Sequence, residues 1–492
     1  MKYLIGLDIG TTAVKAMIVD INGNIVVKSS KAYHLIFPRA GWVEQEPEEM
    51  WQAVVAAIEA ALAQFNGSRQ DIQALSLSTQ RDTMVCVDAH NQPVRNAITW
   101  MDARSVAECA QLSSAFGAER VYDITGVNVS PIWTFAFILW MRAHEPENFA
   151  RTACFGLVHD FIMCRLGATE HYVDTSNACQ TMLYDYRANV WSSDLMAYGG
   201  LSADRLPHLV APGVHIGTIH PLLAQRWQLS PTLGLVSGGG DQQCAALGAG
   251  AVQSKDVEIG IGTAANLLAI TDAPIADPLQ RMICHRAAIK DKFVLEGAML
   301  AMGRIVEWMK TEIFPYASLS EVDALIDMQS VPGAGGIIAL PHFEGAACPY
   351  WNPQATGALI GLRLSTSKAD IARALMESTG FEIKKSLDLL NQFGICPASL
   401  RISGGASRST VWMQMLADIL EVDVEIPRES DCAALGAALL AGLGCRVFSD
   451  VAQAAGQMVS IRQVYHPRDE YRKIYRNIYV KNKALYTLLN DH

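Results

Sequence analysis

The chain opens with short apolar segments separated by glycine-containing turns, a pattern that predicts β-strands. Residues 3–7 are a continuous apolar run, and residues 14–19 form a second strand-like segment, with Lys15 as its one polar residue, after a Gly-Thr-Thr turn. Asn22-Gly23, a strong hairpin signal, then precedes the β-branched run 25–27. The chain is therefore expected to begin with three strands joined by two tight turns.

Longer stretches with helical spacing alternate with further strands along the chain. Proline and acidic residues open an apolar stripe at residues 47–65, and Gly394 ends a long helical pattern that begins near residue 366. The other expected helices are residues 130–142, 433–443 and 470–489, and the other expected strands are residues 74–78, 84–87, 97–100, 337–340 and 400–402. Strands that alternate with helices are typical of an α/β fold.

The composition is that of a globular enzyme. Of 492 residues, 50% are hydrophobic and 18% are charged, which is enough apolar material for two or three domains. The net charge of -10 disfavours nucleic acid or an anionic membrane as a partner, since both require basic surfaces. The sequence contains neither a membrane-spanning apolar run nor a signal-peptide pattern, so a cytoplasmic location is expected. The 11 cysteines are scattered and form no C-x-x-C pair, which favours free thiols over disulfide or metal chemistry.

Asp8 and the turn that follows it form the first candidate site. Consecutive backbone N–H groups and the hydroxyls of Thr11 and Thr12 make a concavity suited to phosphate oxygens. Asp8 is suited to hold Mg²⁺, which binds one or two carboxylates together with water and substrate phosphates. An ordinary β-turn that starts with an aspartate is the alternative interpretation.

Two further polar segments follow predicted strands. Gln80, Arg81 and Asp82 come soon after the expected strand 74–78, and Trp100 ends the expected strand 97–100. Open α/β sheets bind ligands at the ends of their strands. Arg81 and Asp82 are suited to vicinal hydroxyls of a sugar or polyol, and Trp100 is suited to the floor of such a pocket. A surface ion pair and a core tryptophan are the alternatives.

Asp241 follows three consecutive glycines and begins a small, apolar helical pattern. Glycine lets another molecule approach the main chain closely. An acid at the start of a helix lies next to the positive end of the helix dipole, which keeps it ionised and able to accept a proton from a bound hydroxyl. The alternative is an N-cap aspartate after a flexible turn.

Residues 256–269 repeat the strand–turn–strand pattern of the N-terminus around Gly262 and Thr263, which predicts a second phosphate cradle. Further on, Gly404 and Gly405 separate the expected strand 400–402 from a helix. Glycines in that position let the backbone lie against a flat base or its phosphates. The two cradles resemble the halves of a duplicated nucleotide-clamping unit.

These motifs, taken in order, resemble the FGGY carbohydrate kinases, which share a superfamily of folds with actin and hexokinase. The resemblance covers nearly the whole chain. Its motifs are Asp8-x-Gly10-Thr11-Thr12, Gly239-Gly240-Asp241-Gln242-Gln243, Gly262-Thr263, Gly404-Gly405-Ala406 with Ser409, and a near match to the C-terminal signature between Gly357 and Ile371. The resemblance implies an α/β fold with two actin-like (ribonuclease H-like) ATPase domains and a nucleotide cleft between them. The expected domains are residues 1–244 and residues 245–492.

The resemblance also implies an activity, which is transfer of the γ-phosphoryl group of ATP to a hydroxyl of a small carbohydrate or polyol. Asp241 is then the expected general base, and Asp8 the expected Mg²⁺ ligand. By comparison with the glycerol kinases of the family, the expected substrate contacts are Gln80, Arg81, Asp82, Trp100, Asp241 and Gln242. The expected nucleotide contacts are Thr11, Thr12, Gly262, Thr263, Gly303, Gly404, Gly405 and Ser409. Homodimers are frequent in the family, so a homodimer is a further expectation.

Four positions depart from the glycerol kinase pattern. Asp82 stands in place of Glu, Ile132 in place of a substrate-contacting Tyr, Phe137 in place of Lys, and Glu307 in place of Gln at the nucleotide. The shorter acid and the lost hydroxyl imply a ketose or a longer polyol rather than glycerol. Two alternatives have the same fold: a catalytically degenerate sensor that binds sugar and nucleotide, and a nucleotide-driven binding protein, which has no need of the sugar contacts beside Asp241.

Overall fold

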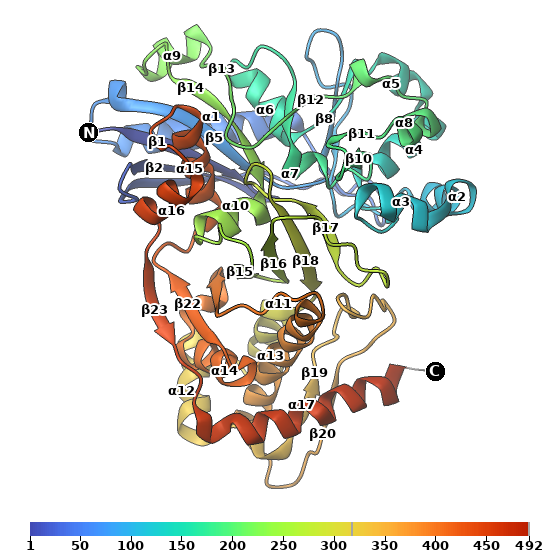
Figure 1. Ribbon diagram of the computed structural model, residues 1–492, viewed down its shortest axis with the longest axis vertical. Helices are drawn as coiled ribbons and strands as arrows, with labels where there is room; N and C mark the ends of the chain where they lie inside the picture. Colours follow the sequence, from blue (N-terminus) through green and yellow to red (C-terminus); the bar gives the residue numbers. More distant parts are fainter. Residues whose placement is uncertain (316–317, 491–492) are drawn as a thin grey trace. The chain divides into compact units, whose positions relative to one another are not determined.

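The computed structural model describes residues 1–315 and 318–490. The chain forms two compact units, each assembled from separate segments of the sequence (Figure 1). Unit 1 consists of Met1–Val252, Thr271–Val294 and Cys432–Val459, and unit 2 consists of Gln253–Ile270, Leu295–Asp431 and Ser460–His492. The predicted domain boundary between residues 244 and 245 stays a prediction. The two compact units differ from it, because residues 271–294 and 432–459 belong to unit 1.

Unit 1 is built on a mixed sheet with the strand order β13-β14-β5-β1-β2-β3. Its strands are β1 (Tyr3–Ile9), β2 (Ala13–Asp20), β3 (Ile25–Ala32), β5 (Ile72–Thr79), β13 (His215–Thr218) and β14 (Gly234–Gly240). β5 runs parallel to both β1 and β14, whereas β2 is antiparallel to β1. The carboxyl ends of β1, β5 and β14 therefore lie side by side at one edge of the sheet.

The central strands of this sheet are apolar because both of their faces are covered. Leu4, Ile5 and Leu7 of β1 are buried although they alternate between faces. On one face the strands pack with α1 (Pro47–Gln64), and α15 (Cys432–Gly444) also contacts β1 and β5. A Cβ atom at Gly6 would lie 2.0 Å from the Ala434 carbonyl oxygen, so α15 approaches the strand backbone directly.

A second apolar cluster of unit 1 surrounds a smaller sheet with the order β4-β7-β6-β8. The predicted helix 130–142 is observed as α4, which begins at Thr134 because the Phe135 N–H donates to the Thr181 carbonyl at 2.9 Å outside the helix. The remaining strands of unit 1 are β4 (Glu44–Gln45), β6 (Met84–Val87), β7 (Ala97–Ile98), β8 (Cys154–Leu157), β9 (Tyr172–Asp174), β10 (Tyr184–Asp185), β11 (Val190–Trp191), β12 (His208–Val210) and β17 (Ile283–Arg286). Its other helices are α2 (Val106–Leu112), α3 (Ala118–Thr125), α4 (Thr134–His144), α5 (Pro146–Arg151), α6 (Val158–Leu166), α7 (Thr175–Ala178), α8 (Ser193–Gly199), α9 (Pro221–Trp227), α10 (Asp241–Gly248) and α16 (Val451–Met458).

Unit 2 repeats the central topology of unit 1. Its strands β18-β16-β15-β21-β22-β23 follow one another in a sheet. β15 and β16 form an antiparallel pair, β15, β21 and β22 run parallel, and β23 is antiparallel to β22. These strands are β15 (Val257–Ile261), β16 (Ala265–Thr271), β18 (Phe293–Met299), β21 (Ser399–Ser403), β22 (Asp423–Pro427) and β23 (Ile461–Tyr465). The turn after β15 therefore occupies the same topological place as the turn after β1.

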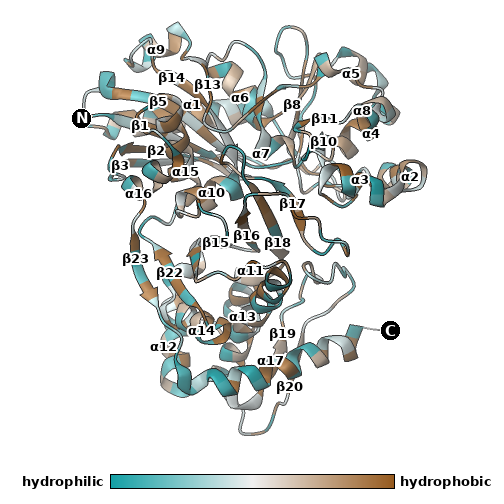
Figure 2. Cartoon of the chain, in the orientation of Figure 1, coloured by the Kyte–Doolittle hydropathy of each residue, from teal (hydrophilic) through white to brown (hydrophobic). Residues whose placement is uncertain are grey.

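The long helices of unit 2 follow the predicted patterns. Its helices are α11 (Met302–Trp308), α12 (Leu319–Gln329), α13 (Lys368–Gln392), α14 (Thr410–Leu420) and α17 (Asp469–Asn490), and β19 (Ile338–Leu340) pairs with β20 (Ala358–Ile360). α17 buries Tyr475, Tyr479, Asn482 and Tyr486, which form one stripe along the helix. In Figure 2, α17 carries both teal and brown residues along its length, whereas β16 and β18 are brown.

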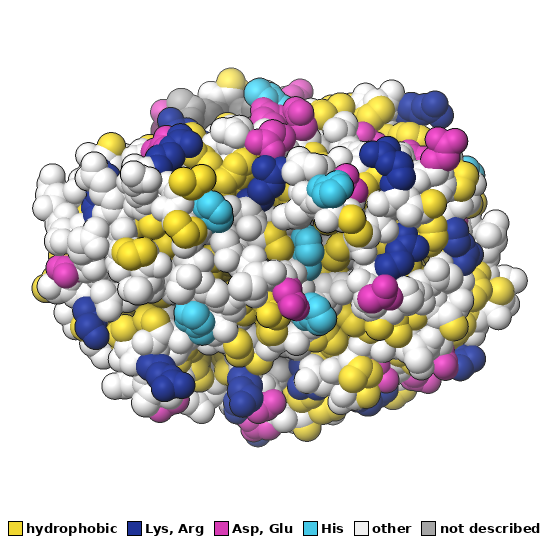
Figure 3. Space-filling model, turned by 90° about the horizontal axis from the view of Figure 1, so that it is seen from above, with side chains coloured by type: hydrophobic (Ala, Val, Ile, Leu, Met, Phe, Trp, Pro, Cys, Tyr) yellow, Lys and Arg dark blue, Asp and Glu magenta, His cyan; other side chains and the backbone are white. Residues whose placement is uncertain are grey.

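The surface carries charges of both signs. Figure 3 shows Lys and Arg side chains interspersed with Asp and Glu side chains on the face that it presents. Within the described ranges, no helix combines the length and the apolar character that crossing a membrane requires.

Candidate functional site

The candidate residues of unit 1 gather where β1, β5 and β14 end. Asp8 of β1 is paired in register with Ser78 of β5, which is itself paired with Gly239 of β14. The segments that continue from these three strands carry Thr11, Arg81 and Asp241 respectively. The fold thus brings together, at the carboxyl edge of one sheet, motifs that lie far apart in the sequence.

Asp241 is the first residue of α10 and directly follows β14. One of its carboxylate oxygens accepts a hydrogen bond from the Gln242 N–H at 2.8 Å, and the same oxygen lies 3.5 Å from Arg81 Nε. Its side chain is 29% exposed. The helix N-terminus and the guanidinium both place positive charge next to this carboxylate, which remains within reach of a ligand.

Gly240 makes room for Arg81 beside Asp241. A Cβ atom at Gly240 would lie 2.9 Å from Arg81 Cδ and 2.6 Å from the Gln243 side-chain oxygen. Any larger residue at this position would displace the arginine from the aspartate. Close packing of side chains therefore explains the glycine at 240, whereas a Cβ atom at Gly238 would lie 1.7 Å from the Leu77 carbonyl oxygen of β5.

A buried chain of polar side chains supports Arg81 from behind. Arg81 donates to the Gln243 side-chain oxygen at 3.5 Å, and the Gln243 amide donates to His285 Nδ1 at 3.0 Å. The Gln180 amide contacts the same imidazole nitrogen at 2.9 Å. Gln180, Gln243 and His285 are all buried. This support fixes the direction of the guanidinium, and among its members only Gln243 lies in a motif visible in the sequence.

Hydrogen bonds hold the turn after Asp8 from several sides. The Ser78 hydroxyl donates to Asp8 at 2.9 Å, and the Tyr33 hydroxyl donates to the Gly10 carbonyl. Burial, together with the charge of Asp8, raises the pKa of Tyr33, so this hydroxyl stays protonated. The Gln45 amide donates to the Thr11 carbonyl at 2.6 Å.

The predicted substrate contacts differ in how far they are exposed. Gln80 is 2% exposed, and its amide donates to Gln45 at 2.8 Å, so it supports the turn. Asp82 is also buried, in a left-handed backbone conformation with φ of 62°. Trp100 is 41% exposed, and its indole N–H donates to the Thr11 hydroxyl at 3.0 Å. Gln242 is half-buried next to Asp241.

The two apolar departures from the glycerol kinase pattern in unit 1 have different surroundings. Phe137 is fully buried in the apolar cluster of α4, so it serves the core. Ile132 is partly buried against the same cluster.

The candidate residues of unit 2 surround a cavity of about 710 Å³. Of the predicted nucleotide contacts, Gly262, Thr263, Gly303 and Gly405 line it. The other lining residues are Ile261, Arg304, Val306, Glu307, Ser318, Leu319, Ser320, Asp323, Ala406, Arg408 and Trp412. A cavity of this volume, with one apolar part and one glycine-rich part, is suited to a nucleoside and its phosphates.

Gly404 and Ser409 lie beside this cavity and shape its wall. Gly404 has a φ of 86°, and a Cβ atom there would lie 2.5 Å from the Ile261 carbonyl oxygen, so the turn requires glycine. The Ser409 hydroxyl accepts from the Trp412 N–H at 2.9 Å and donates to Asp323 at 2.6 Å. Ser409 therefore caps α14 and positions Asp323, which no sequence motif had indicated.

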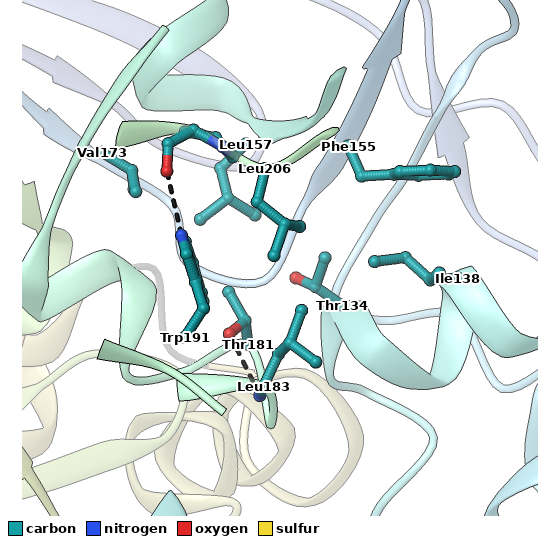
Figure 4. A pocket seen from close by; sticks show the side chains of 10 residues that line it. Thr134, Ile138, Phe155, Leu157, Val173, Thr181, Leu183, Trp191 and Leu206 are labelled. Atoms are coloured by element: carbon teal, nitrogen blue, oxygen red, sulfur yellow. Dashed lines mark hydrogen bonds between the residues drawn. The ribbon is translucent and has the colours of Figure 1, made fainter. Parts of the chain in front are cut away.

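Unit 1 also contains a cavity too small for a ligand. It measures about 10 Å³, and most of its lining is apolar (Figure 4). Trp191 donates from its indole to the Pro207 carbonyl at 3.0 Å, and the Leu183 N–H donates to the Thr181 hydroxyl at 3.3 Å. This space holds at most about one water molecule and carries no chemistry.

Oxygen donors suited to Mg²⁺ lie at the strand ends of unit 1. Asp8 in β1 and Asp241 after β14 bring carboxylates to the same edge of the sheet. Burial raises the pKa of the Cys244 thiol, and the negative charges of Asp174, Asp8 and Asp241 add to the shift. Such donors fit a hard cation that also takes phosphate and water oxygens. Elsewhere in the described chain, Cys154, Asp160 and His171 have potential ligand atoms within 4.8 Å of one another. There His171 Nδ1 lies 2.8 Å from Asp160, which also accepts from the Leu157 N–H, so this cluster is an ion pair at a helix start.

Family models match both halves of the chain. The N-terminal domain of the FGGY family of carbohydrate kinases matches residues 3–248, and the C-terminal domain of that family matches residues 258–445. The chain is 32% identical over 499 residues to the xylulose kinase of Bacillus subtilis, covering 100% of this chain and 99% of that protein. It is 33% identical over 479 residues to the glycerol kinase of Methylibium petroleiphilum, covering 94% and 95%.

Solved structures of kinases have the same architecture. A xylulose kinase structure from Brucella ovis superposes with a TM-score of 0.92 at 28% identity, covering 99% of each chain. A xylulose kinase structure from Rhodospirillum rubrum also gives a TM-score of 0.92, at 26% identity, and covers 100% of this chain and 99% of that one. The predicted α/β fold with two actin-like domains is therefore confirmed, while the predicted roles of individual residues stay predictions.

Proposed function

Because this chain belongs to the FGGY family of carbohydrate kinases, we propose that it transfers the γ-phosphoryl group of ATP to a hydroxyl of a small sugar or polyol, with Asp241 as the general base. The observation that carries this proposal is the position of Asp241. Its carboxylate opens α10 at the carboxyl edge of the sheet, 3.5 Å from Arg81 Nε and on the same edge as the turn after Asp8.

Asp241 accepts the proton of the attacking hydroxyl as that oxygen forms its bond to the γ-phosphorus. The bond between the γ-phosphorus and the bridging oxygen breaks at the same time, and ADP leaves. A positioned general base is typically worth about 10²- to 10⁴-fold in rate. Arg81 holds the Asp241 carboxylate in place, and the exposed indole of Trp100 supports the sugar beside the Thr11 hydroxyl.

The nucleotide occupies the cavity of unit 2 in this proposal. Gly262, Thr263 and Gly303 face its phosphates, while Gly405 lies against the nucleoside. Thr11 and Thr12 contribute phosphate contacts from the turn after β1, where Asp8 would hold Mg²⁺. The cation, when bound, neutralises the charge of the transferring phosphoryl group.

The acceptor in this proposal is a ketose or a polyol longer than glycerol. Relatives of similar identity to this chain include both a xylulose kinase and a glycerol kinase, so identity alone does not choose between these substrates. Two residues of this chain favour a ketose or a longer polyol over glycerol. Ile132 supplies no hydroxyl, and Asp82 is a shorter acid than the glutamate of the glycerol kinase pattern.

A coupled ADP-release assay with Mg·ATP and a panel of ketoses, polyols and sugar acids tests the proposal. The Asp241→Asn variant keeps the shape of the side chain and removes the base, so kcat for the responding substrate should fall by about 10²- to 10⁴-fold. Asp204→Asn, a matched change at an exposed site, should leave kcat unchanged. Near-wild-type kcat in Asp241→Asn would remove Asp241 from the role of base. Sugar binding without turnover, measured by calorimetry in the wild-type protein, would favour the sensor.

A further inference from the structure

The lining of the unit 2 cavity contains two groups of residues held by different contacts. In the first, the Gly303 N–H donates to the Gly262 carbonyl at 3.0 Å, and the Arg304 N–H donates to the Thr263 carbonyl at 3.2 Å. This group presents backbone and a hydroxyl, as phosphates require. In the second, Ser409 links Asp323 to the start of α14, where Trp412 lies. That group combines apolar side chains with one carboxylate.

Asp323 is a suitable acceptor for a group on the ligand. One of its carboxylate oxygens accepts the Ser409 hydroxyl proton at 2.6 Å, and that hydroxyl also accepts from the Trp412 N–H. Ser409 has therefore committed its single proton, and the second oxygen of Asp323 is not engaged by this bond. Burial raises the pKa of Asp323, the Ser409 hydrogen bond offsets the shift in part, and the charge of Asp327 adds to it. A donor from a ligand would compensate this charge.

Two other charged residues of the lining are engaged in ion pairs at the surface, and a third, Arg408, is exposed. Glu307 is 64% exposed and lies 2.8 Å from Lys310, its partner one helical turn away. Arg304 is 60% exposed and lies 2.6 Å from Glu344. Water screens such exposed pairs, so they discriminate poorly between ligands. Asp323, in contrast, is half-buried, and the lining of the same cavity includes the apolar side chains of Ala406 and Trp412.

We propose that Asp323 selects the nucleotide, by accepting a hydrogen bond from the exocyclic amine of adenine. This inference rests on the proposed use of ATP. Flat apolar surface beside an acceptor is what an aminopurine requires. A 6-oxopurine would instead direct an acceptor oxygen at the carboxylate and leave both groups unpaired. A site that hydrogen-bonds one group rejects the analogue that lacks it, because its buried partner is left unsatisfied.

Calorimetric titration with ADP and with IDP tests this inference without any sugar. IDP differs from ADP in carrying an oxygen in place of the amine. The wild-type protein should bind ADP about 10- to 100-fold more tightly than IDP, as expected for a hydrogen bond to a charged group. Asp323→Asn should abolish or reverse this preference, because the asparagine amide can donate a hydrogen bond to the oxygen that IDP carries in place of the amine. Asp327→Asn, an exposed position one turn further along α12, should keep the wild-type ratio.

The outcomes separate this inference from the proposed function. Equal affinity of the wild-type protein for ADP and IDP would overturn the inference, needs no variant, and leaves the proposed use of ATP standing. An unchanged ratio in Asp323→Asn, with a wild-type thermal melt, would overturn it as well. Failure of the wild-type protein to bind either nucleotide would overturn the proposed use of ATP, and the inference with it.

Discussion

At Gly303, one added methyl group should disturb the proposed nucleotide site directly. Gly303 lies in the first turn of α11, and its N–H donates to the Gly262 carbonyl at 3.0 Å. A Cβ atom at Gly303 would lie 2.1 Å from that same carbonyl oxygen. In Gly303→Ala, α11 and the turn after β15 must therefore move apart.

The size of that movement sets the expected effect. Relieving the clash requires a shift of about 1 Å, because non-bonded carbon and oxygen atoms do not approach as closely as 2.1 Å. Overpacking of this kind costs about 1–3 kcal/mol of folding free energy, with this case near the upper end. The hydrogen bond from Gly303 to Gly262 is lost with the shift. Since Gly262 and Thr263 line the cavity, we expect ATP affinity to fall by about 10-fold or more.

Calorimetric titration with ATP and a thermal melt measure both effects. Gly303→Ala should lower the Tm by about 2–4 °C for each kcal/mol lost. Gly262→Ala is the matched control for stability, because its Cβ atom would lie 3.9 Å from the nearest atom, the Ala264 carbonyl oxygen, and its Tm should stay near the wild-type value. Wild-type Tm together with wild-type ATP affinity in Gly303→Ala would refute the reasoning.

Two further predictions concern α10, which begins with the proposed general base Asp241, and the core of unit 2. In Gly436→Ala, the new Cβ atom would lie 2.0 Å from the Cys244 carbonyl oxygen of α10. We therefore expect the free energy of unfolding to fall by about 1–3 kcal/mol, and kcat to fall because Asp241 is displaced. An unchanged thermal melt and kcat would contradict this. Burial raises the pKa of Glu258 from its ordinary 4.5 to about 8, against the opposing hydrogen bond from Ser403. The stability that neutral Glu258 contributes is therefore fully present below pH 4.5 and is lost as the pH rises towards 8. Glu258→Gln should flatten this fall by up to about 1.4 kcal/mol per pH unit. Urea denaturation at several pH values measures the free energy of unfolding of both proteins, and the same pH dependence in the two would contradict this prediction.

The strands and turns that begin each unit could be predicted because their signals are local. A buried strand followed by a glycine turn and a second strand forms a continuous sequence segment at both β1–β2 (Tyr3–Asp20) and β15–β16 (Val257–Thr271). The start of α13 also has a local signal, because Ser367 and Asp370 have the spacing of a capping box. Local patterns thus predict the elements that carry the glycine turns.

The supports of the site could not be predicted, because they join residues that only the fold brings together. Gln243 and His285 are 42 positions apart, and Ser409 and Asp323 are 86 positions apart. Neither His285 nor Asp323 belongs to a spaced motif, and a lone acid or histidine in a sequence carries no information about its partner. For the same reason the sequence did not indicate that Gln80 is buried and donates to Gln45. Its predicted contact with the substrate stays a prediction.

The place of α15 in unit 1 has a consequence for how the protein is made. Cys432–Gly444 packs against α10 and against β1, β5 and β14, where Gly6, Gly248 and Gly436 allow backbones to meet. A ribosome that has released only the first 431 residues has therefore synthesised every strand of that sheet without the helix that covers one of its faces. Domains usually fold in the order of their synthesis. Here the unit that emerges first completes its core only after most of the other has emerged. The nascent chain therefore carries an uncovered apolar sheet from the synthesis of β14, which ends at Gly240, until that of α15, which begins at Cys432.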